Sequence, residues 1–259
     1  MSPCLLSIAP DATVDEAARA LQEHDVSCLA VVSGGSVRGV VSLRDLMGST
    51  VVSLREGASA PAPAVSDVMT SHVLTVDDAA PLSAAAHKMV EQHVHRLFVR
   101  RGAGADSDTA TLAPVVGVIS TRDLMRAVMK ARQNTPIGDL MVSPVATVDV
   151  GESIESAVQM LGEREIRGLV VVDGEAPVGV FTQLEAVRAR KLPPELRSRP
   201  VEEAMSYETI CLDAHTKVYR AAGHAVAMNV RRLLVVEKRK LVGILTGFDL
   251  AKVVAASAA

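Results

Sequence analysis

Four short tracts of the sequence place a hydroxyl residue three positions before a carboxylic acid. Each tract reads Gly, two apolar residues, then Ser or Thr, and the pairs are Ser42 and Asp45, Ser120 and Asp123, Thr182 and Glu185, and Thr246 and Asp249. At a helix start such a pair can form a capping box, in which side chains satisfy free backbone N–H groups. The acid can instead accept two hydrogen bonds from a ribose diol, while the positive helix end favours an anion.

The length of the acid separates these two interpretations. A capping box favours Glu or Gln at the third helical position, because the longer side chain reaches back to the cap. Three copies carry Asp, and only Glu185 is the residue preferred for capping. The pattern therefore favours ligand binding at Asp45, Asp123 and Asp249, and leaves both interpretations open at Glu185.

The tracts belong to a repeated unit. The residues that open the copies are small, and they are Ser7, Thr75, Thr147 and Cys211. The acid follows the opening residue by 38 residues in three copies and by 48 in the second. In every copy Ala lies ten residues and a β-branched residue nineteen residues after the opening, and Met lies six residues before it. This register predicts four repeats, at 1–64, 65–130, 136–192 and 200–259.

Within a repeat the apolar pattern alternates between helix and strand. The spacing of Val14, Ala17, Ala18 and Leu21 predicts a helical face, and the tract at 29–32 predicts a strand. A turn, the Gly-containing strand and a helix opened by Ser or Thr follow. The unit reads β-α-β-β-α, and the fold class is α+β. One copy would bury its sheet face poorly alone, so we expect copies to pair.

Composition marks the boundaries between repeats. The predicted linkers are Ser49–Val65, Lys130–Thr135 and Lys191–Pro200, and the central one divides the chain into halves of nearly equal size. The extra residues of the second copy fall in the polar stretch Arg101–Ala113, so Gly102–Asp108 is predicted to be a loop. The run Lys238–Lys240 is predicted to be a solvated turn.

Composition also excludes several function classes. The 259 residues include 27 basic and 30 acidic ones, no Trp, two Tyr and three Phe, which argues against a nucleic-acid binder. The three Cys form no C-x-x-C pair, so neither a disulfide framework nor a zinc site is predicted. No long apolar run and no secretory signal is present, so we expect a soluble cytoplasmic protein.

No enzyme is predicted, because the sequence carries no nucleophile elbow, phosphate-binding P-loop or H-E-x-x-H motif. His93 and His95 alternate faces at a predicted strand start, so we expect that they do not both point into one site.

The combined pattern Thr75…Ala85…Val94-His95-Arg96…Gly117-Val-Ile-Ser-Thr-Arg-Asp-Leu124 resembles a cystathionine-β-synthase-type (CBS) repeat. The resemblance covers nearly the whole chain in four copies. It implies that repeats pair by their sheets into two Bateman modules, packed as a disc with clefts for adenosyl ligands. The arrangement is similar to that of the γ-subunit of AMP-activated protein kinase.

The resemblance also implies the roles of single residues. The Ser/Thr-x-x-Asp acid holds the ribose hydroxyls, and His95-Arg96 and Arg231-Arg232 meet phosphate. The first copy has Ser27-Cys28 at this position, and the third retains only Arg167. The predicted ligand-binding residues are Ser42, Asp45, Thr75, His95, Arg96, Ser120, Arg122, Asp123, Thr147, Arg167, Thr182, Arg231, Arg232, Thr246 and Asp249.

The leading functional hypothesis is a non-catalytic energy or metabolite sensor. It binds AMP, ADP or ATP in clefts between paired repeats, requires no cofactor or metal, and signals to a partner protein or to a second copy in a homodimer. The alternatives are an interaction scaffold with mostly empty clefts and a sensor of another adenosyl ligand. The basic pairs argue against S-adenosylmethionine, whose sulfonium is positively charged. We expect no membrane partner, and a net acidic chain disfavours nucleic acid.

Overall fold

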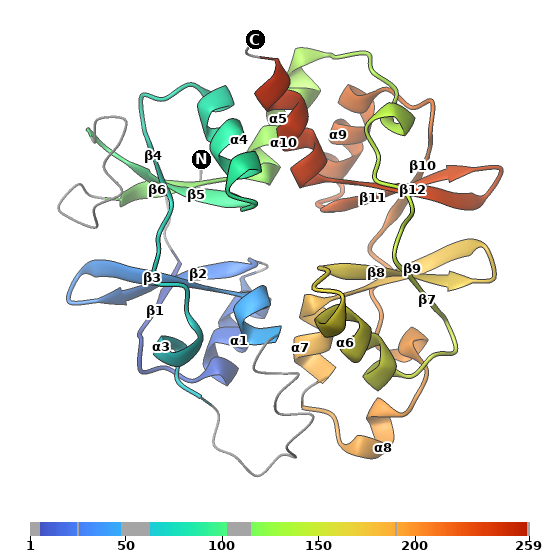
Figure 1. Cartoon of the computed structure of the whole chain (residues 1–259), viewed down its shortest axis with the longest axis horizontal. Helices are drawn as coiled ribbons and strands as arrows, with labels where there is room; N and C mark the ends of the chain where they lie inside the picture. The colour runs from blue at the N-terminus through green and yellow to red at the C-terminus, as the bar shows by residue number, and fades with distance from the viewer. Residues whose placement is uncertain (1–5, 25, 48–62, 103–114, 190, 258–259) are drawn as a thin grey trace. The chain divides into compact units, whose positions relative to one another are not determined.

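The computed structural model describes residues 6–24, 26–47, 63–102, 115–189 and 191–257. Within these ranges each repeat forms a three-stranded sheet (Figure 1). The middle strand pairs parallel with the first strand and antiparallel with the third. The predicted α+β class and the β-α-β-β-α order are confirmed.

The elements alternate as the repeat predicts. Repeat 1 contains β1 (Ser7–Ile8), α1 (Val14–Glu23), β2 (Cys28–Ser33), β3 (Ser36–Ser42) and helical residues 43–47. Repeat 2 contains β4 (Thr75–Asp77), α4 (Leu82–Glu91), β5 (Arg96–Arg100), β6 (Val115–Ser120) and α5 (Thr121–Ala131). Repeat 3 contains β7 (Thr147–Asp149), α6 (Ile154–Glu163), β8 (Gly168–Asp173), β9 (Ala176–Thr182) and α7 (Gln183–Ala189). Repeat 4 contains β10 (Ile210–Asp213), α9 (Val218–Ala227), β11 (Arg232–Glu237), β12 (Lys240–Thr246) and α10 (Gly247–Ala256).

Short helices lie in the segments that connect the repeats. They are α3 (Val65–Val68), η1 (Ile137–Asp139), α8 (Pro194–Arg197) and η2 (Val201–Glu203). Two predicted linkers are therefore partly helical: α5 runs to Ala131, and α8 begins at Pro194, a residue suited to a helix start. Residues 103–108 of the predicted Gly102–Asp108 loop and most of the Ser49–Val65 linker lie outside the described residues.

The hairpin turn of repeat 4 is built without glycine. Lys238 and Arg239 have φ values of 49° and 69°, where repeat 1 uses Gly34 and Gly35. Lys238, Arg239 and Lys240 are all exposed, so the prediction of a solvated turn is confirmed.

The repeats group into two compact units that do not follow the sequential halves. One unit comprises residues 74–145 and 208–259, and therefore repeats 2 and 4. The other comprises residues 6–73 and 146–207, and therefore repeats 1 and 3. Each unit takes one repeat from either side of Lys130–Thr135, so the compact units are not the two sequential halves that this stretch divides. The reason is that helices from alternate repeats share their cores.

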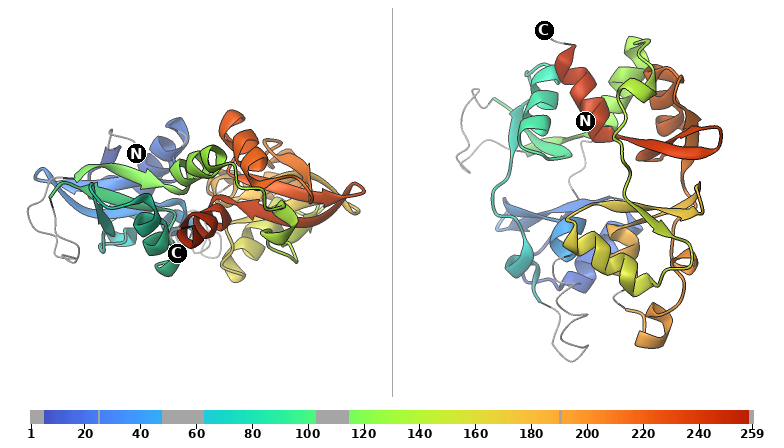
Figure 2. Two further views of the ribbon diagram at one scale, coloured as in Figure 1. Left: turned by 90° about the horizontal axis from the view of Figure 1, so that it is seen from above. Right: turned by 45° about the vertical axis from the view of Figure 1, so that its right-hand side comes forward.

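In the unit of repeats 2 and 4, helix α10 packs against α4 and α5, and α5 packs against α9. The views of Figure 2 show α5 in green and α10 in red side by side. Alanines form much of the contact, since Ala251 and Ala255 of α10 share a buried cluster with Ala85 and Ala86 of α4. Small side chains let helix backbones approach closely, which explains the high Ala content of these helices.

In the unit of repeats 1 and 3, one buried cluster combines side chains of both repeats. It contains Val14 and Leu21 of α1 together with Ile154 and Leu161 of α6 and Phe181 of β9. A repeat on its own would expose half of such a cluster to water, which is why repeats 1 and 3 share one core.

The repeated Met and Gly residues meet in the folded chain. Single antiparallel bridges join Thr70 to Val40, Val142 to Ile244 and Ser206 to Val180, so three connecting segments each extend the edge of a sheet. Beside each bridge, a Met side chain packs so closely on the repeated Gly that a Cβ added to this Gly would clash with it. The pairs are Met69 with Gly39, Met141 with Gly243, and Met205 with Gly179. The Gly therefore leaves room for a crossing backbone and its Met.

We predict that Gly39→Ala destabilises the protein by about 1–3 kcal/mol, because the new Cβ overpacks this crossing. The Cβ would stand 2.8 Å from the carbonyl oxygen of Thr70. Urea denaturation followed by circular dichroism measures the change. Gly223→Ala in α9 is the control, because its new Cβ would meet only the Met129 side chain, at ordinary distances of 3.7 and 3.8 Å. This variant should stabilise the helix by roughly 0.5–1 kcal/mol. Equal stability of Gly39→Ala and the wild type would contradict the assigned role of the glycine.

Candidate functional site

The four hydroxyl residues of the sequence tracts all lie at the same point of the fold. Ser42, Ser120, Thr182 and Thr246 each end the third strand of their sheet, and a helix begins at the next residue. The backbone of Ser120 and Thr246 is extended, as expected for a residue that precedes the first helical turn. The repeat thus places four equivalent pairs of hydroxyl and acid at strand-to-helix junctions.

Every acid of these tracts accepts hydrogen bonds from the residue that precedes its helix. The backbone N–H groups of Ser42, Ser120, Thr182 and Thr246 donate to the acid at 2.7, 2.9, 2.9 and 3.0 Å, respectively. The hydroxyl of each residue donates to the same carboxylate oxygen.

The Asp copies therefore cap their helices as Glu185 does. The argument that the shorter Asp arm separates ligand binding from capping is wrong. The extended backbone of the cap turns its N–H toward the third helical residue, and a short side chain then suffices.

The second oxygen of each carboxylate has a different partner. Asp123 Oδ1 lies 3.2 Å from Nη1 of Arg126, and Asp249 Oδ1 lies 3.0 Å from Nζ of Lys252. The side chains of Arg126 and Lys252 are both 52% exposed. The Asp123 and Asp249 side chains are only 14% and 5% exposed, so each pair joins a largely buried carboxylate to a half-exposed cation, and a ligand reaches this oxygen by displacing the cation. A carboxylate accepts about four hydrogen bonds, so capping by one oxygen leaves the other available.

The strand register distinguishes the four tracts. The residue directly across the sheet from the cap is Arg96 for Ser120 and Arg232 for Thr246. The corresponding residues are Cys28 for Ser42 and Gly168 for Thr182. Directly opposed residues of an antiparallel pair share a face, with Cβ atoms about 4.5–5.5 Å apart. Repeats 2 and 4 therefore place an Arg directly across the sheet from the capping residue, and repeats 1 and 3 do not.

Four other predicted residues lie next to a strand or at the start of a helix near these tracts. His95, Arg167 and Arg231 immediately precede β5, β8 and β11, and the carbonyl of His95 accepts a hydrogen bond from the Thr121 N–H at 2.9 Å. Arg122 is the second residue of α5 and is half-buried.

Two predicted ligand residues do not adjoin the acid tract of their own repeat. Thr75 and Thr147 begin β4 and β7, and the central strands β5 and β8 lie between these strands and the tracts.

His93 and His95 approach the same aromatic ring, contrary to the prediction that they face apart. The His93 and His95 rings lie 6.0 and 5.4 Å from that of Phe248, measured between centroids. The alternation argument fails because His93 precedes the strand and has a φ of 51°. Phe248 is the residue before Asp249, and Lys252 Nζ lies 5.4 Å from the centre of its ring. Sequence reasoning missed Phe248, although it is one of only three Phe and stands inside a tract.

The environment of Asp123 favours its ionised form. Burial alone would raise the pKa of this carboxyl, but the hydrogen bonds from the backbone N–H and hydroxyl of Ser120 act in the opposite direction, and the pKa is lowered from its ordinary value of 3.8. The acid is therefore a carboxylate at neutral pH and can only accept hydrogen bonds, as a ribose diol requires.

The described part of the chain shows no cluster of His, Cys, Asp or Glu able to hold a metal ion. In the same residues no helix combines the length and apolar character needed to cross a membrane.

The model of one protein family, the CBS domain, matches residues 1–51, 65–130, 137–191 and 201–256. The chain belongs to the CBS-domain family. The resemblance read from the four tracts is thereby confirmed.

Two crystal structures show the same four-repeat CBS fold. MJ1225 of Methanocaldococcus jannaschii, described as a candidate archaeal homologue of γ-AMPK, matches with a TM-score of 0.82 at 19% identity, covering 98% of this chain and 97% of that protein. A conserved protein of Pyrococcus horikoshii matches with a TM-score of 0.64 at 22% identity over 98% and 97% of the two chains. At these identities the likeness shows the fold alone.

Among curated proteins, MJ1404 of Methanocaldococcus jannaschii is 24% identical over 98% of this chain. This chain spans 61% of the length of MJ1404. A homoserine O-acetyltransferase of Methanohalobium evestigatum is 25% identical, but the match covers 47% of this chain and 24% of that enzyme. The acetyltransferase name therefore does not transfer to this CBS-domain chain.

We predict that Asp123→Asn lowers stability most at neutral pH. A carboxylate whose pKa is lowered in the folded state stabilises it above the unfolded pKa and loses this contribution as the pH falls through the folded value. The gap in unfolding free energy between wild type and variant should be about 1 kcal/mol near pH 7 and shrink below about pH 4. Urea titrations over this pH range measure it, with the exposed hairpin variant Asp173→Asn as control. A gap independent of pH would contradict the prediction.

Proposed function

We propose that this CBS-domain protein is a non-catalytic sensor that binds an adenine nucleotide at the tracts of repeats 2 and 4. The observation that supports it is the pairing of a capping Asp with a cation across the sheet. Arg96 lies opposite Ser120, and Arg232 lies opposite Thr246. One carboxylate and one guanidinium at neighbouring positions match a molecule that carries both a sugar diol and phosphate.

The ribose is bound by the carboxylate oxygens that do not cap. Asp123 and Asp249 keep one oxygen on the cap, while the other exchanges Arg126 or Lys252 for a ribose hydroxyl. A hydrogen bond from a ribose hydroxyl to the charged carboxylate contributes about 1.5–3 kcal/mol, which offsets the loss of the half-exposed cation that it replaces.

The phosphate is bound by the basic residues and by the helix ends. Helices α5 and α10 begin at Thr121 and Gly247 and direct the positive ends of their dipoles toward the tracts. Arg96 and Arg232 supply charge beside them, with His95 and Arg231 one residue earlier. This arrangement suits AMP, ADP or ATP and disfavours S-adenosylmethionine, whose positive sulfonium would face the same cations.

The ring of Phe248 offers a route by which repeat 2 responds to a ligand in repeat 4. Lys252 contacts both Asp249 and this ring, and His93 and His95 of repeat 2 contact the ring as well. A ribose that displaces Lys252 from Asp249 therefore alters a contact between repeats. Coupling of this kind is typically about 1–3 kcal/mol.

A structural scaffold is the second candidate, and one observation favours it. All four acids are already hydrogen-bonded within their own helix ends without any ligand. In the scaffold the four tracts serve only as helix caps, and the basic residues of repeats 2 and 4 keep their contacts within the chain.

We predict that Asp123→Ala and Asp249→Ala each weaken AMP binding by about ten- to a hundredfold, the loss of one charged hydrogen-bonding group. Isothermal titration with AMP, ADP and ATP measures the affinities. Glu16→Ala is the matched control, because Glu16 caps α1 through Thr13 in the same way but lies outside the tracts. A wild-type protein that does not bind nucleotide would favour the scaffold. So would equal nucleotide affinities of the Asp123→Ala, Asp249→Ala and Glu16→Ala variants.

A further inference from the structure

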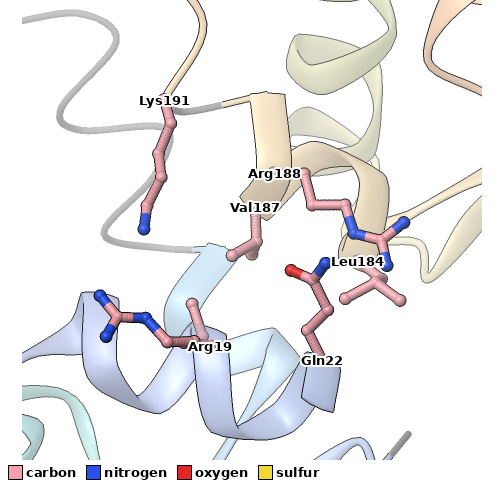
Figure 3. A pocket seen from close by; sticks show the side chains of 7 residues that line it. Arg19, Gln22, Leu184, Val187, Arg188 and Lys191 are labelled. Atoms are coloured by element: carbon pink, nitrogen blue, oxygen red, sulfur yellow. The ribbon is translucent and has the colours of Figure 1, made fainter.

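A groove lies between helices α1 and α7 in the unit of repeats 1 and 3. It has a volume of about 140 Å³ and is lined by Ala18, Arg19, Gln22, Leu184, Val187, Arg188 and Lys191 (Figure 3). This volume is far below the roughly 300–1,000 Å³ of pockets that enclose small molecules, so the groove does not enclose a nucleotide. It has room for a side chain that enters from outside.

The floor of the groove is apolar because of how the two helices pack. Helix α1 turns Val14, Ala17 and Leu21 into the core, which leaves Ala18 on the flank of the buried face. Leu184 and Val187 of α7 lie opposite. The short side chain of Ala18 leaves the space between the helices unfilled.

The rim of the groove is cationic. Arg19, Arg188 and Lys191 are exposed, and no acid is among the described residues that line the groove. Arg188 has a weak partner, since its Nη1 lies 3.7 Å from Oε1 of Glu185. Figure 3 shows the guanidinium groups of Arg19 and Arg188 on opposite sides of the groove, with the Lys191 ammonium apart from both. Cations that lie on different sides of the groove suit several carboxylates spaced along a chain.

We propose that this groove is a docking site for an acidic peptide segment of a partner protein. An aliphatic side chain of the segment enters between Ala18, Leu184 and Val187. Carboxylates on either side pair with Arg19, Arg188 and Lys191. Charge complementarity and the apolar floor together select this occupant, because a phosphate would leave the floor empty and an uncharged peptide would form no ion pair with the rim.

The site is distinct from the proposed nucleotide tracts. Its Arg188 pairs with Glu185, the acid of the repeat 3 tract, where Gly168 stands at the position that Arg96 and Arg232 occupy in repeats 2 and 4. Peptide binding and nucleotide binding therefore depend on different residues, and either can fail without the other.

The test uses the full chain and a fluorescein-labelled peptide, Asp-Glu-Leu-Glu-Asp, followed by fluorescence anisotropy at low salt without nucleotide. We expect saturable binding that weakens with added salt, and no binding of the matched peptides Asn-Gln-Leu-Gln-Asn and Asp-Glu-Ser-Glu-Asp. Arg19→Gln and Lys191→Gln should each weaken binding about two- to fivefold. Ala18→Leu should abolish it by filling the groove.

Controls separate the groove from general charge and from misfolding. Arg164→Gln removes an exposed cation of the same unit outside the groove and should leave the peptide affinity unchanged. All variants should keep the wild-type circular dichroism spectrum and the wild-type affinity for AMP.

Several results would overturn the proposal. The first is that the acidic peptide does not bind. The second is that Arg19→Gln, Lys191→Gln and the wild type bind this peptide with equal affinity. The third is that the uncharged peptide binds as tightly as the acidic one. Pyrophosphate that binds with the same dependence on Arg19 and Lys191, and without effect of Ala18→Leu, would assign the groove to a small anion. Self-association by sedimentation velocity that Ala18→Leu abolishes would assign it to a second copy of this chain.

Discussion

The structure depends on a carboxylate that folds back onto the residue before its helix. In all four repeats the acid accepts hydrogen bonds from a backbone N–H and a hydroxyl at the end of the third strand. A buried N–H without a partner would cost about 1–3 kcal/mol, so the contact fixes the direction in which the chain leaves the sheet. It also places one acid per repeat at the positive end of a helix, and for Asp123 it lowers the pKa of the carboxyl.

The same contact allows one residue to combine a structural role with the proposed binding role. Capping uses a single oxygen of Asp123 or Asp249, and the second oxygen holds only a half-exposed cation. The fold therefore keeps a carboxylate that is already oriented, and a ligand need not order it. What differs among the four copies is the residue across the sheet from the cap: it is Arg96 in repeat 2 and Arg232 in repeat 4, but Cys28 in repeat 1 and Gly168 in repeat 3.

Small residues decide how the repeats assemble. Gly39, Gly179 and Gly243 admit a crossing backbone with its Met, and the alanines of α4 and α10 admit a neighbouring helix. Each core is shared by two repeats, and Phe248 of repeat 4 also contacts His93 and His95 of repeat 2. These contacts are the physical connection that the proposed coupling between repeats would use.

The sequence alone determined the repeat, the order of its elements, the helical face of Ile154, Ala157, Val158 and Leu161, and the hydroxyl and acid at each helix start. These features are local, since periodicity and cap chemistry act within a few residues. The tertiary structure alone decided that repeats 2 and 4 share one unit, that His93 and His95 meet one ring, and that Ala18 leaves a groove beside α7. Because the four copies have similar apolar faces, their sequence pattern is compatible with several pairings of the repeats. Only the packing of side chains that are distant in the sequence selects one of these pairings.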